Sequence, residues 1–368
     1  MKLRRGTALM LAVLCLLLCA CGSAERGKSE RVTLWCLEDE PLRQPLEELI
    51  QEYNRSPGEW QQVSLRCFPD EESLAAAFDT ARPDLLLCSH DRARTLEQQA
   101  LLRDLRADLG AAAPEYPESL CQAPDGVGSG YFPLGVQVTL LCLREEADEN
   151  WTDLETLFAA ASDYGREEGG AFFTADSFSE LFYQALLSQK TEFHADHLRD
   201  RNTPAYLSLY NALAGGAFDR GITLSEHGAA ELVAAGALPC GAAASSSMTV
   251  LPGTGFVIRP LPGLEEDAPL PGRAMGLAVT AREGRSLRSA AAFLRWLLSD
   301  GRAGRAALAA GLIPAALSEA PEAESPLEEL LLSLKAERTL FLLPPESDYL
   351  KNQAAFEQAF RAVLRRFL

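Results

Sequence analysis

The chain has 368 residues, of which 34 are basic and 52 are acidic, so its formal net charge at pH 7 is -18. This acidic balance argues against a nucleic-acid partner, which would need a basic face, and against adhesion of the folded surface to anionic lipid. The length favours two domains or one large bilobal unit, and nine cysteines are too few for a disulfide scaffold of this size.

Residues 1–20 have the features of a lipoprotein signal peptide. A basic start precedes an uncharged run over residues 8–20, which is shorter than the ~20 apolar residues of a membrane-spanning helix. The run ends in Leu-Cys-Ala-Cys at residues 18–21, which resembles the bacterial lipobox. The resemblance implies cleavage after Ala20 and a diacylglyceryl thioether with palmitate-type acyl chains on Cys21. An ordinary secretory signal is the alternative.

The mature chain would then begin with a lipid-anchored tether. Residues 21–30 are polar and small and have no apolar period, which predicts a flexible segment. No later apolar run in the sequence approaches membrane-spanning length. We therefore expect the protein to be held at the extracytoplasmic face of the cell membrane through the lipid on Cys21.

Beyond the tether, short apolar runs alternate with segments of helical periodicity. We expect strands over residues 31–35, 63–68 and 83–88. We expect helices over residues 41–53, 73–78 and 95–109, the second of them capped by Ser73. This alternation is typical of a parallel sheet with helices packed on its faces.

The remainder of the chain continues in the same way. Residues 131–143 form a long apolar run that predicts a strand, and a helix is expected after Trp151, with Thr152 or Asp153 as its N-cap. Further strands are expected over residues 256–262 and 275–280. Further helices are expected over residues 177–188, 205–215 and 286–298, before Gly311, and from Asp348 onward.

Several short segments occur in an order that is typical of one protein family. They are Pro83-Asp84-Leu85-Leu86, Asp125-Gly126 followed by Tyr131 to Val136, Trp151-Thr152-Asp153-Leu154, Ala290 to Leu297, and Gly311-Leu312-Ile313-Pro314. Together with the opening strand and helix and the lipobox, they resemble the family 1 extracellular solute-binding proteins, the maltose-binding-like lipoproteins of ABC importers. The loop over residues 241–248 departs from the family, because it carries serines where many sugar-binding members carry an aromatic residue.

This resemblance implies an α/β, bilobal periplasmic-binding-protein-like (type 2) fold, with two α/β lobes joined by a multi-strand hinge. Lobe 1 is expected to contain residues 31–133 and 274–315, and lobe 2 residues 134–273 and 316–368. The implied function is that of a substrate-binding lipoprotein of an ABC importer, which captures a small polar solute, most often a carbohydrate, between closing lobes. ABC permease subunits would be its partners, and no cofactor is implied.

The expected ligand site lies between the lobes, beyond the carboxyl ends of the strands. Trp35 could stack on a sugar or a cation there, with core packing as the alternative. Serine hydroxyls from both lobes could bind a polar solute, and acidic side chains after the first strand would suit a cationic one. The expected ligand-binding residues are Trp35, Glu38, Ser89, His90, Tyr131, Phe132, Phe173, Ser246 and Ser247.

The sequence offers little support for catalysis. Ser-His-Asp at residues 89–91 is consecutive, whereas a catalytic relay draws its parts from separated segments. His-Ala-Asp-His at residues 194–197 could hold a metal, but an exposed helix end is the simpler interpretation. Walker, Gly-x-Ser-x-Gly and His-Glu-x-x-His motifs do not occur. We expect a binding protein rather than an enzyme; a surface sensor or adhesion module, or a surface lipoprotein hydrolase, are the alternatives.

Three cysteines lie near the ends of three consecutive predicted strands. They are Cys36, Cys67 and Cys88, which the sheet is expected to bring close together. Buried thiols are one interpretation and a strand-to-strand disulfide is another, and the choice between them depends on geometry.

Overall fold

We describe the protein from a computed structural model. The structure describes residues 30–55, 61–121, 130–147, 149–178, 180–181, 204–262, 270–281, 284–317, 321–342, 358, 361–362 and 365. The expected signal peptide, Cys21, the expected tether up to residue 29 and the motif at residues 194–197 lie outside these residues. So do nearly all of the helix expected from Asp348 and most of the helix expected over residues 177–188.

The described strands form a mixed sheet with the order β2-β1-β3-β8-β4-β6-β5, in which β10 also pairs with β8, and β7 and β9 with β4. Strands β1, β2 and β3 are parallel to one another, as expected. The expectation of a parallel sheet is correct only for these three strands, because β8 lies antiparallel to both β3 and β4. The strands are β1 (Glu30–Leu37), β2 (Gln61–Phe68), β3 (Leu85–Ser89), β4 (Tyr131–Arg144), β5 (Phe173–Ala175), β6 (Cys240–Ala244), β7 (Phe256–Pro260), β8 (Leu270–Val279), β9 (Ile313–Pro314) and β10 (Leu340–Leu342).

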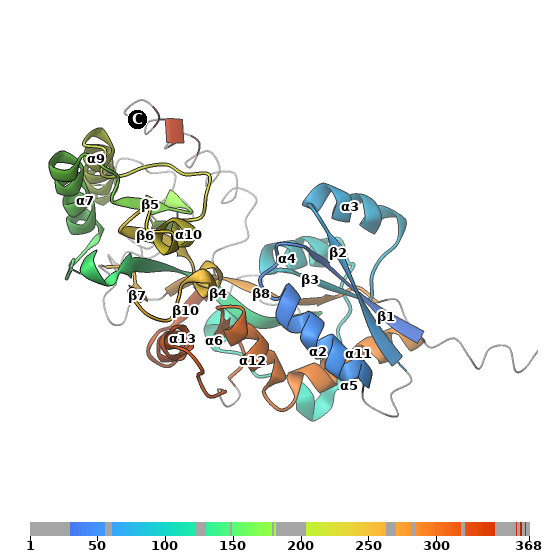
Figure 1. Ribbon diagram of the computed structural model, residues 1–368. Helices are drawn as coiled ribbons and strands as arrows, with labels where there is room; N and C mark the ends of the chain where they lie inside the picture. Colours follow the sequence, from blue (N-terminus) through green and yellow to red (C-terminus); the bar gives the residue numbers. More distant parts are fainter. Residues whose placement is uncertain are drawn as a thin grey trace, which may run out of the picture.

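Strand β4 is shared by the two ends of the sheet. Its first part, up to Val138, pairs with β8, whereas its second part, from Thr139, pairs with β6 and β7. The strand expected over residues 131–143 is therefore confirmed, and its continuous apolar sequence follows from burial on both faces. Figure 1 shows β4 and β8 passing between one body that contains β1, β2, β3 and α2 and another that contains β5, β6 and α7.

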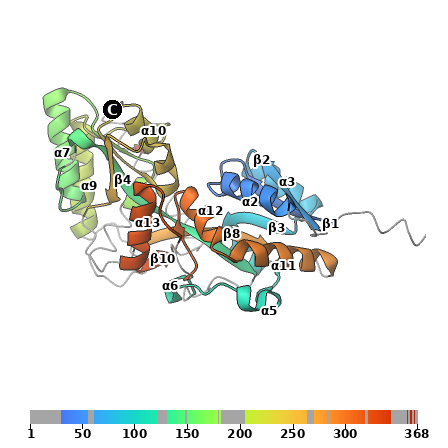
Figure 2. The same ribbon diagram turned by 60° about the horizontal axis from the view of Figure 1, so that its bottom comes forward.

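Helices cover both bodies. On the β1 side, α2, α5 and α11 pack on one face of the sheet, and α3 and α4 pack on the other; Figure 2 shows α11 lying along this body. The α-helices are α2 (Arg43–Arg55), α3 (Glu71–Thr80), α4 (His90–Gln98), α5 (Arg106–Leu109), α6 (Glu118–Cys121), α7 (Leu154–Glu168), α9 (Pro204–Phe218), α10 (Ala229–Ala234), α11 (Arg285–Leu298), α12 (Arg302–Ala309) and α13 (Pro326–Glu337). The 3-10 helices are η1 (Gly110–Ala112), η2 (Glu145–Ala147) and η4 (Ser245–Val250).

The buried side chains gather in four clusters. Successive residues of β1 alternate between two of them: Leu34 and Cys36 face α2 and α11, whereas Trp35 faces α3 and α4. The second cluster lies between β5, β6, α7 and α9. The third runs along the middle of β4 and β8 and includes residues of α10, α12 and α13. The two ends of the sheet thus have separate hydrophobic clusters, and a further cluster lies along its middle.

Two helix starts differ from those expected. Helix α3 is capped by Asp70, whose Oδ1 accepts a hydrogen bond from the Ser73 N–H at 2.7 Å, so Ser73 lies inside the helix. Helix α4 begins at His90, directly after β3, and ends before Ala100, which has a positive φ of 55°. The expected single helix over residues 95–109 is therefore two, α4 and α5. For α7, Asp153 is the N-cap, one of the two residues expected.

Within the described residues, none of the helices has the length and apolar character that are needed to cross a membrane.

Candidate functional site

One group of polar residues lies where β1 and β3 end. We call it the β3-side group; its members are Glu40, Ser89, His90, Asp91 and Arg92. Ser89 ends β3 and is the N-cap residue of α4, but its side chain makes no capping hydrogen bond. The first backbone N–H groups of α4 therefore lack a side-chain acceptor from their cap residue. N–H groups in this position can donate to a polar ligand.

Glu40 is the electrostatic centre of the β3-side group. It is half-buried, and burial together with the negative charge of Asp39 raises the pKa of its carboxyl to about 7, although the positive charge of Arg92 opposes this shift. Glu40 lies close enough to Cys88 and Tyr131 to raise the pKa of both, which burial already raises. Near neutral pH, Glu40 can therefore either donate or accept a hydrogen bond.

Three other side chains of this group have neighbours close by. Arg92 forms an ion pair with Glu71 of α3, and His90 Nε2 lies 3.5 Å from Asp91 Oδ1. Burial lowers the pKa of the Arg92 guanidinium, and the negative charge of Glu40 offsets part of this shift. Glu40 therefore differs from Arg92, whose charge is paired with Glu71.

A second polar group lies at the other end of the sheet. We call it the β6-side group; its members are Thr139, Asp176, Glu180, Ser246 and Arg273. Asp176 directly follows β5, and its carboxylate accepts hydrogen bonds from the N–H of Ala229 at 2.7 Å and of Ala244 at 3.4 Å. These bonds join the end of β5 to the start of α10 and the end of β6.

Glu180 occupies the middle of the β6-side group. One carboxylate oxygen accepts a hydrogen bond from Thr139 Oγ1 at 2.7 Å, and the other lies 3.2 Å from Arg273 Nη2. Glu180 and Arg273 are both half-buried, so solvent screens this pair less than it would an exposed pair. The pair links β8 to the segment that follows β5.

Strand β8 brings the two groups together. Met275 of β8 is the register partner of Ser89, and Arg273 lies two residues away on the same strand, a separation of about 7 Å at the usual strand rise. Arg273 is also the register partner of Gln137 on β4. Ser89 of the β3-side group and Arg273 of the β6-side group therefore lie near each other across β8.

The serine loop at the start of η4 packs against the end of α12. Ser245 is fully buried, and its Oγ accepts a hydrogen bond from the Val138 N–H at 3.3 Å. Gly311 has a positive φ of 70°, and a Cβ there would lie 2.6 Å from Ser245 O and 2.9 Å from Ser246 Cα. Only glycine fits this contact without strain, which gives the glycine of the Gly-Leu-Ile-Pro segment a physical role.

The expected aromatic ligand-binding residues are buried. Trp35 is 5% exposed and packs on Phe68 with ring centroids 5.0 Å apart, which supports the core-packing alternative. Phe132 and Phe173 lie in core clusters, and the Tyr131 hydroxyl bonds to backbone carbonyl oxygens. In this conformation none of these four rings is open to a ligand, and their contact with one stays a prediction.

Four of the five expected polar residues lie closer to the surface than the aromatic ones. Ser89 and His90 belong to the β3-side group and Ser246 to the β6-side group; both serines are half-buried, whereas His90 is buried. Ser247 is half-buried beside Ser246, and Glu38 is exposed at the end of β1. The structure places these residues after β1, where β3 ends and in η4, and their roles in binding stay predictions.

Sequence reasoning did not select Glu40, Asp176, Glu180 or Arg273. A signal existed for Asp176, because it directly follows the apolar run at residues 172–175 and polar residues at strand ends often face ligands. No local signal existed for the other three, since their environments depend on partners far away in the sequence.

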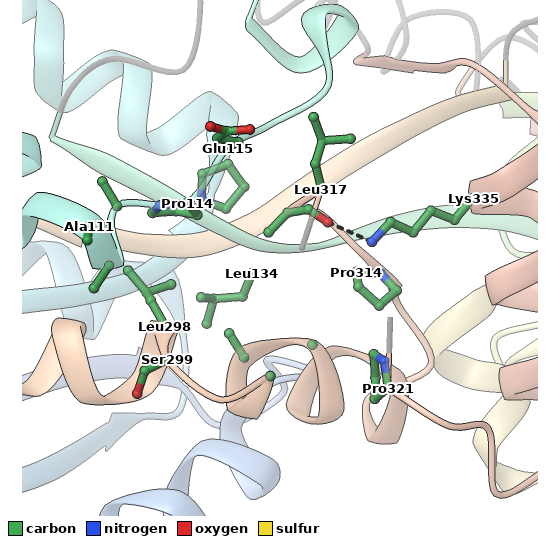
Figure 3. Close-up of a pocket in the computed structure, with 17 residues that line it drawn as sticks. Ala111, Pro114, Glu115, Leu134, Leu298, Ser299, Pro314, Leu317, Pro321 and Lys335 are labelled. Atoms are coloured by element: carbon green, nitrogen blue, oxygen red, sulfur yellow. Dashed lines mark hydrogen bonds between the residues drawn. The ribbon is translucent and has the colours of Figure 1, made fainter. Parts of the chain in front are cut away.

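A pocket of about 590 Å³ lies apart from both polar groups. Small and apolar residues of η1, α11, α12 and the β9 region form most of its wall, including Pro114, Leu134, Leu298 and Pro314, as Figure 3 shows. Lys335 of α13 is at its edge and donates a hydrogen bond to Ala316 O at 2.6 Å. None of the expected ligand-binding residues lines this pocket.

In the part of the chain that the structure describes, no group of three or more His, Cys, Asp or Glu side chains could hold a metal ion. The motif at residues 194–197 lies outside that part.

The chain matches no protein-family model and no curated protein. Its fold, however, is similar to solved structures over most of its length. The cyclic α-maltosyl-1,6-maltose binding protein of Arthrobacter globiformis is 16% identical, with a TM-score of 0.69 over 92% of this chain and 94% of that one. Maltose-bound MalE3 of T. maritima is also 16% identical, with a TM-score of 0.70 over 92% and 95%.

A third neighbour has a different named substrate. It is PotD, the spermidine/putrescine ABC transporter substrate-binding protein of Streptococcus pneumoniae, which is 14% identical with a TM-score of 0.66 over 91% of this chain and 99% of that one. At such identities these likenesses establish the fold. The expected α/β solute-binding-protein fold is thereby confirmed.

Proposed function

We propose that this chain is the extracytoplasmic substrate-binding protein of an ABC importer and that it captures a carbohydrate between two lobes. The observation that carries the proposal is the shared fold, because 92% of the chain aligns with proteins that are named for binding maltose or a cyclic maltoside. The convergence of two polar groups on β4 and β8 supports the same function, since a polar solute needs directed hydrogen bonds from a preformed site.

In this proposal, lobe 1 comprises residues 31–133 and 274–315, and lobe 2 comprises residues 134–273 and 316–368. The separate core clusters support this division: one pair surrounds β1 and β3, and another cluster surrounds β5 and β6. The third cluster runs along β4 and β8, where the chain would cross between the lobes. Strands β4 and β8 would then act as the hinge.

Binding would be coupled to closure through the two polar groups. A ligand stabilises the closed form only to the extent that it makes contacts there that the open form lacks. Hydrogen bonds to Ser89 and Glu40 on one side and to Glu180, Arg273 and the η4 serines on the other would provide such contacts. The closed shape would be the signal that the permease subunits recognise, and no chemical change of the solute is required.

A cationic solute such as a polyamine is the second candidate. The observation that favours it is the acidic character of both groups, with Glu40 and Asp91 on the β3 side and Asp176 and Glu180 on the β6 side. However, Arg273 is paired with Glu180, and the positive charge of Arg92 lies near Glu40. These two arginines reduce the net negative charge that a cationic ligand would meet. A carbohydrate therefore remains the first candidate for the ligand, ahead of a polyamine.

Attachment to the membrane is part of the proposal. The lipobox-like sequence supports lipidation of Cys21, with residues 22–30 as a spacer between the lipid and the fold. The Cys21→Ser variant is expected to leave the membrane fraction, whereas the unaltered protein should remain in it. Equal membrane retention of both proteins would contradict the anchor.

The ligand class can be tested by thermal shift. We expect maltose, maltotriose or a cyclic maltoside to raise the melting temperature, because a ligand at 100 times its Kd stabilises the folded state by about 2.7 kcal/mol. Spermidine serves as the cationic probe in the same plate. A shift with spermidine alone would favour the second candidate, and no shift with any of these solutes would contradict both.

A further inference from the structure

Two cysteines face each other across the edge of the sheet. Cys36 on β1 and Cys67 on β2 are register partners in a parallel ladder, and their Sγ atoms are 3.5 Å apart. Both side chains lie on the face that packs against α2, where Cys36 is fully buried and Cys67 is half-buried. Directly paired residues on adjacent strands have the Cα separation that a disulfide requires.

The other described cysteines are arranged differently. Cys88 lies on the opposite face of the same sheet, in the cluster that contains Trp35. Cys142 and Cys240 lie on neighbouring strands, but they are offset by one register position and point into different clusters. The thiol of Cys142 instead donates to Gly241 O at 3.4 Å. Among the five cysteines whose side chains are described, the geometry therefore selects Cys36 and Cys67.

The position of β2 favours a bond between them. In the described sheet β2 is the edge strand, so a small displacement toward β1 disturbs few neighbours. The ladder continues beyond the pair, since the Glu38 N–H donates to Phe68 O at 2.9 Å. A covalent link at this point would fasten β2 to β1 immediately before the turn that carries Glu40.

We propose that Cys36 and Cys67 form an intramolecular disulfide when the protein meets a disulfide oxidant, and that this bond fixes the base of the Glu38–Glu40 turn. Its occurrence in the cell depends on the extracytoplasmic location proposed above, because disulfides persist in oxidising compartments. Its formation in the purified protein depends only on the geometry.

The oxidation takes place in two exchange steps. The Cys67 thiol, the more accessible one, loses its proton to solvent, and its thiolate attacks one sulfur of the external disulfide, which releases the first thiol. The Cys36 thiol then loses its proton, and its thiolate attacks the Cys67 sulfur, which releases the second thiol. Two cysteine thiols are oxidised and one external disulfide is reduced to two thiols.

The second step is expected to be slow in the folded protein. Burial, the neighbouring Cys67 and the charge of Glu40 all raise the pKa of the Cys36 thiol. Thiolate is therefore scarce at neutral pH, and the bond should close faster at higher pH or under conditions that loosen β2. Once formed, the buried bond should resist mild reductants.

The test uses the full chain, purified in detergent under reducing conditions and then incubated with oxidised glutathione. Free thiols are alkylated, and the intact mass is measured. We expect two fewer alkylated thiols and, before alkylation, a mass lower by about 2 Da, since two hydrogen atoms leave. The melting temperature should rise by about 5 °C and return to its initial value after strong reduction.

Variants identify the pair. Cys36→Ser and Cys67→Ser should each abolish the loss of two thiols, whereas Cys88→Ser should retain it. The Cys88→Ser protein is also needed for peptide mapping, because Arg82 precedes Pro83 and trypsin therefore leaves Cys67 and Cys88 on one peptide. In that variant, the linked peptides must contain Cys36 and Cys67.

Two results would overturn the proposal. One is complete alkylation of both thiols after prolonged oxidation in a protein that remains folded; the other is a stable glutathione adduct on Cys67 without ring closure. If the bond forms in the purified protein, the geometric inference is supported. Its absence from protein isolated from the cell surface would then count against an oxidising extracytoplasmic location, and so against the proposed function instead.

Discussion

On the β6 side, the carboxylates are already held in place: Asp176 accepts two backbone hydrogen bonds, and Glu180 is bound by Thr139 and Arg273. On the β3 side, none of the described residues hydrogen-bonds the Glu40 carboxylate, and its pKa is raised to about 7. A ligand would thus meet carboxylates already fixed by hydrogen bonds on the β6 side. On the β3 side it would meet a carboxyl, Glu40, whose protonation and hydrogen bonding can still change. In the proposed site, this difference would combine a fixed orientation of the ligand with a response to closure.

The largest expected effect comes from the contact between the serine loop of η4 and the end of α12. Gly311→Ala adds a Cβ 2.6 Å from Ser245 O at a positive φ, so we expect it to lower the free energy of unfolding by about 2–4 kcal/mol. Gly169→Ala is the matched control, because Gly169 has a similar φ of 72° and open space around it. It should cost only about 1 kcal/mol. Urea denaturation measures both, and equal losses would show that the Ser245 contact is unimportant.

The second effect is the contribution of Glu40 to the pH dependence of stability. Its carboxyl has a pKa of about 7 when folded and an ordinary value of 4.5, so between these values the folded state binds the extra proton. Stability should therefore fall as the pH rises from 4.5 to 7, by about 2–3 kcal/mol in total, and this contribution should be flat above pH 7.

The Glu40→Gln variant tests this sign. It should lose that part of the slope and become more stable than the unaltered protein at pH 8, because an ionised half-buried carboxylate is replaced by a neutral amide. Glu38→Gln, at an exposed position in the same turn, should leave the slope unchanged. If Glu40→Gln and Glu38→Gln give identical pH profiles of stability, Glu40 does not have the raised pKa that this prediction requires.

The smallest effect concerns the β6 side. Arg273→Met removes the cation from Glu180, and we expect a loss of about 1 kcal/mol in stability, since the pair is half-buried. Ligand affinity should fall several-fold, because Glu180 would lose its orientation. Arg166→Met, which removes an exposed cation near Asp163 and Asp219, should change stability by less than about 0.5 kcal/mol and leave affinity unchanged. If Arg273→Met and Arg166→Met had equal effects on ligand affinity, Arg273 would not belong to the ligand site.

Most of the fold could be predicted from local patterns. The run at residues 131–143 is apolar throughout because both faces of β4 are buried, and Asp153 caps α7 because its side chain accepts the Thr156 N–H. The antiparallel insertion of β8 between β3 and β4 could not be predicted in this way. It is set by packing between segments that are more than 130 residues apart, as the pairing of Phe132 with Leu277 illustrates.

The site was harder to predict than the fold. Trp35 was expected at a strand end, but β1 continues to Leu37, and the alternation of side chains turns the indole into the core beside Phe68. Glu40 was overlooked because its raised pKa comes mainly from burial, which the acidic sequence of the turn, Glu-Asp-Glu, does not indicate. Sequence patterns predict where strands end. Which side chains at those ends could contact a ligand depends on packing with residues distant in the sequence.

The most direct test of ligand capture between closing lobes is small-angle X-ray scattering with and without a saturating ligand identified in the thermal-shift screen. We expect the radius of gyration to decrease when the ligand is added, because contacts on both sides would draw the lobes together. The decrease should be smaller at the same saturation in Arg273→Met than in the unaltered protein. Saturating binding with an unchanged radius of gyration would contradict a site between two closing lobes.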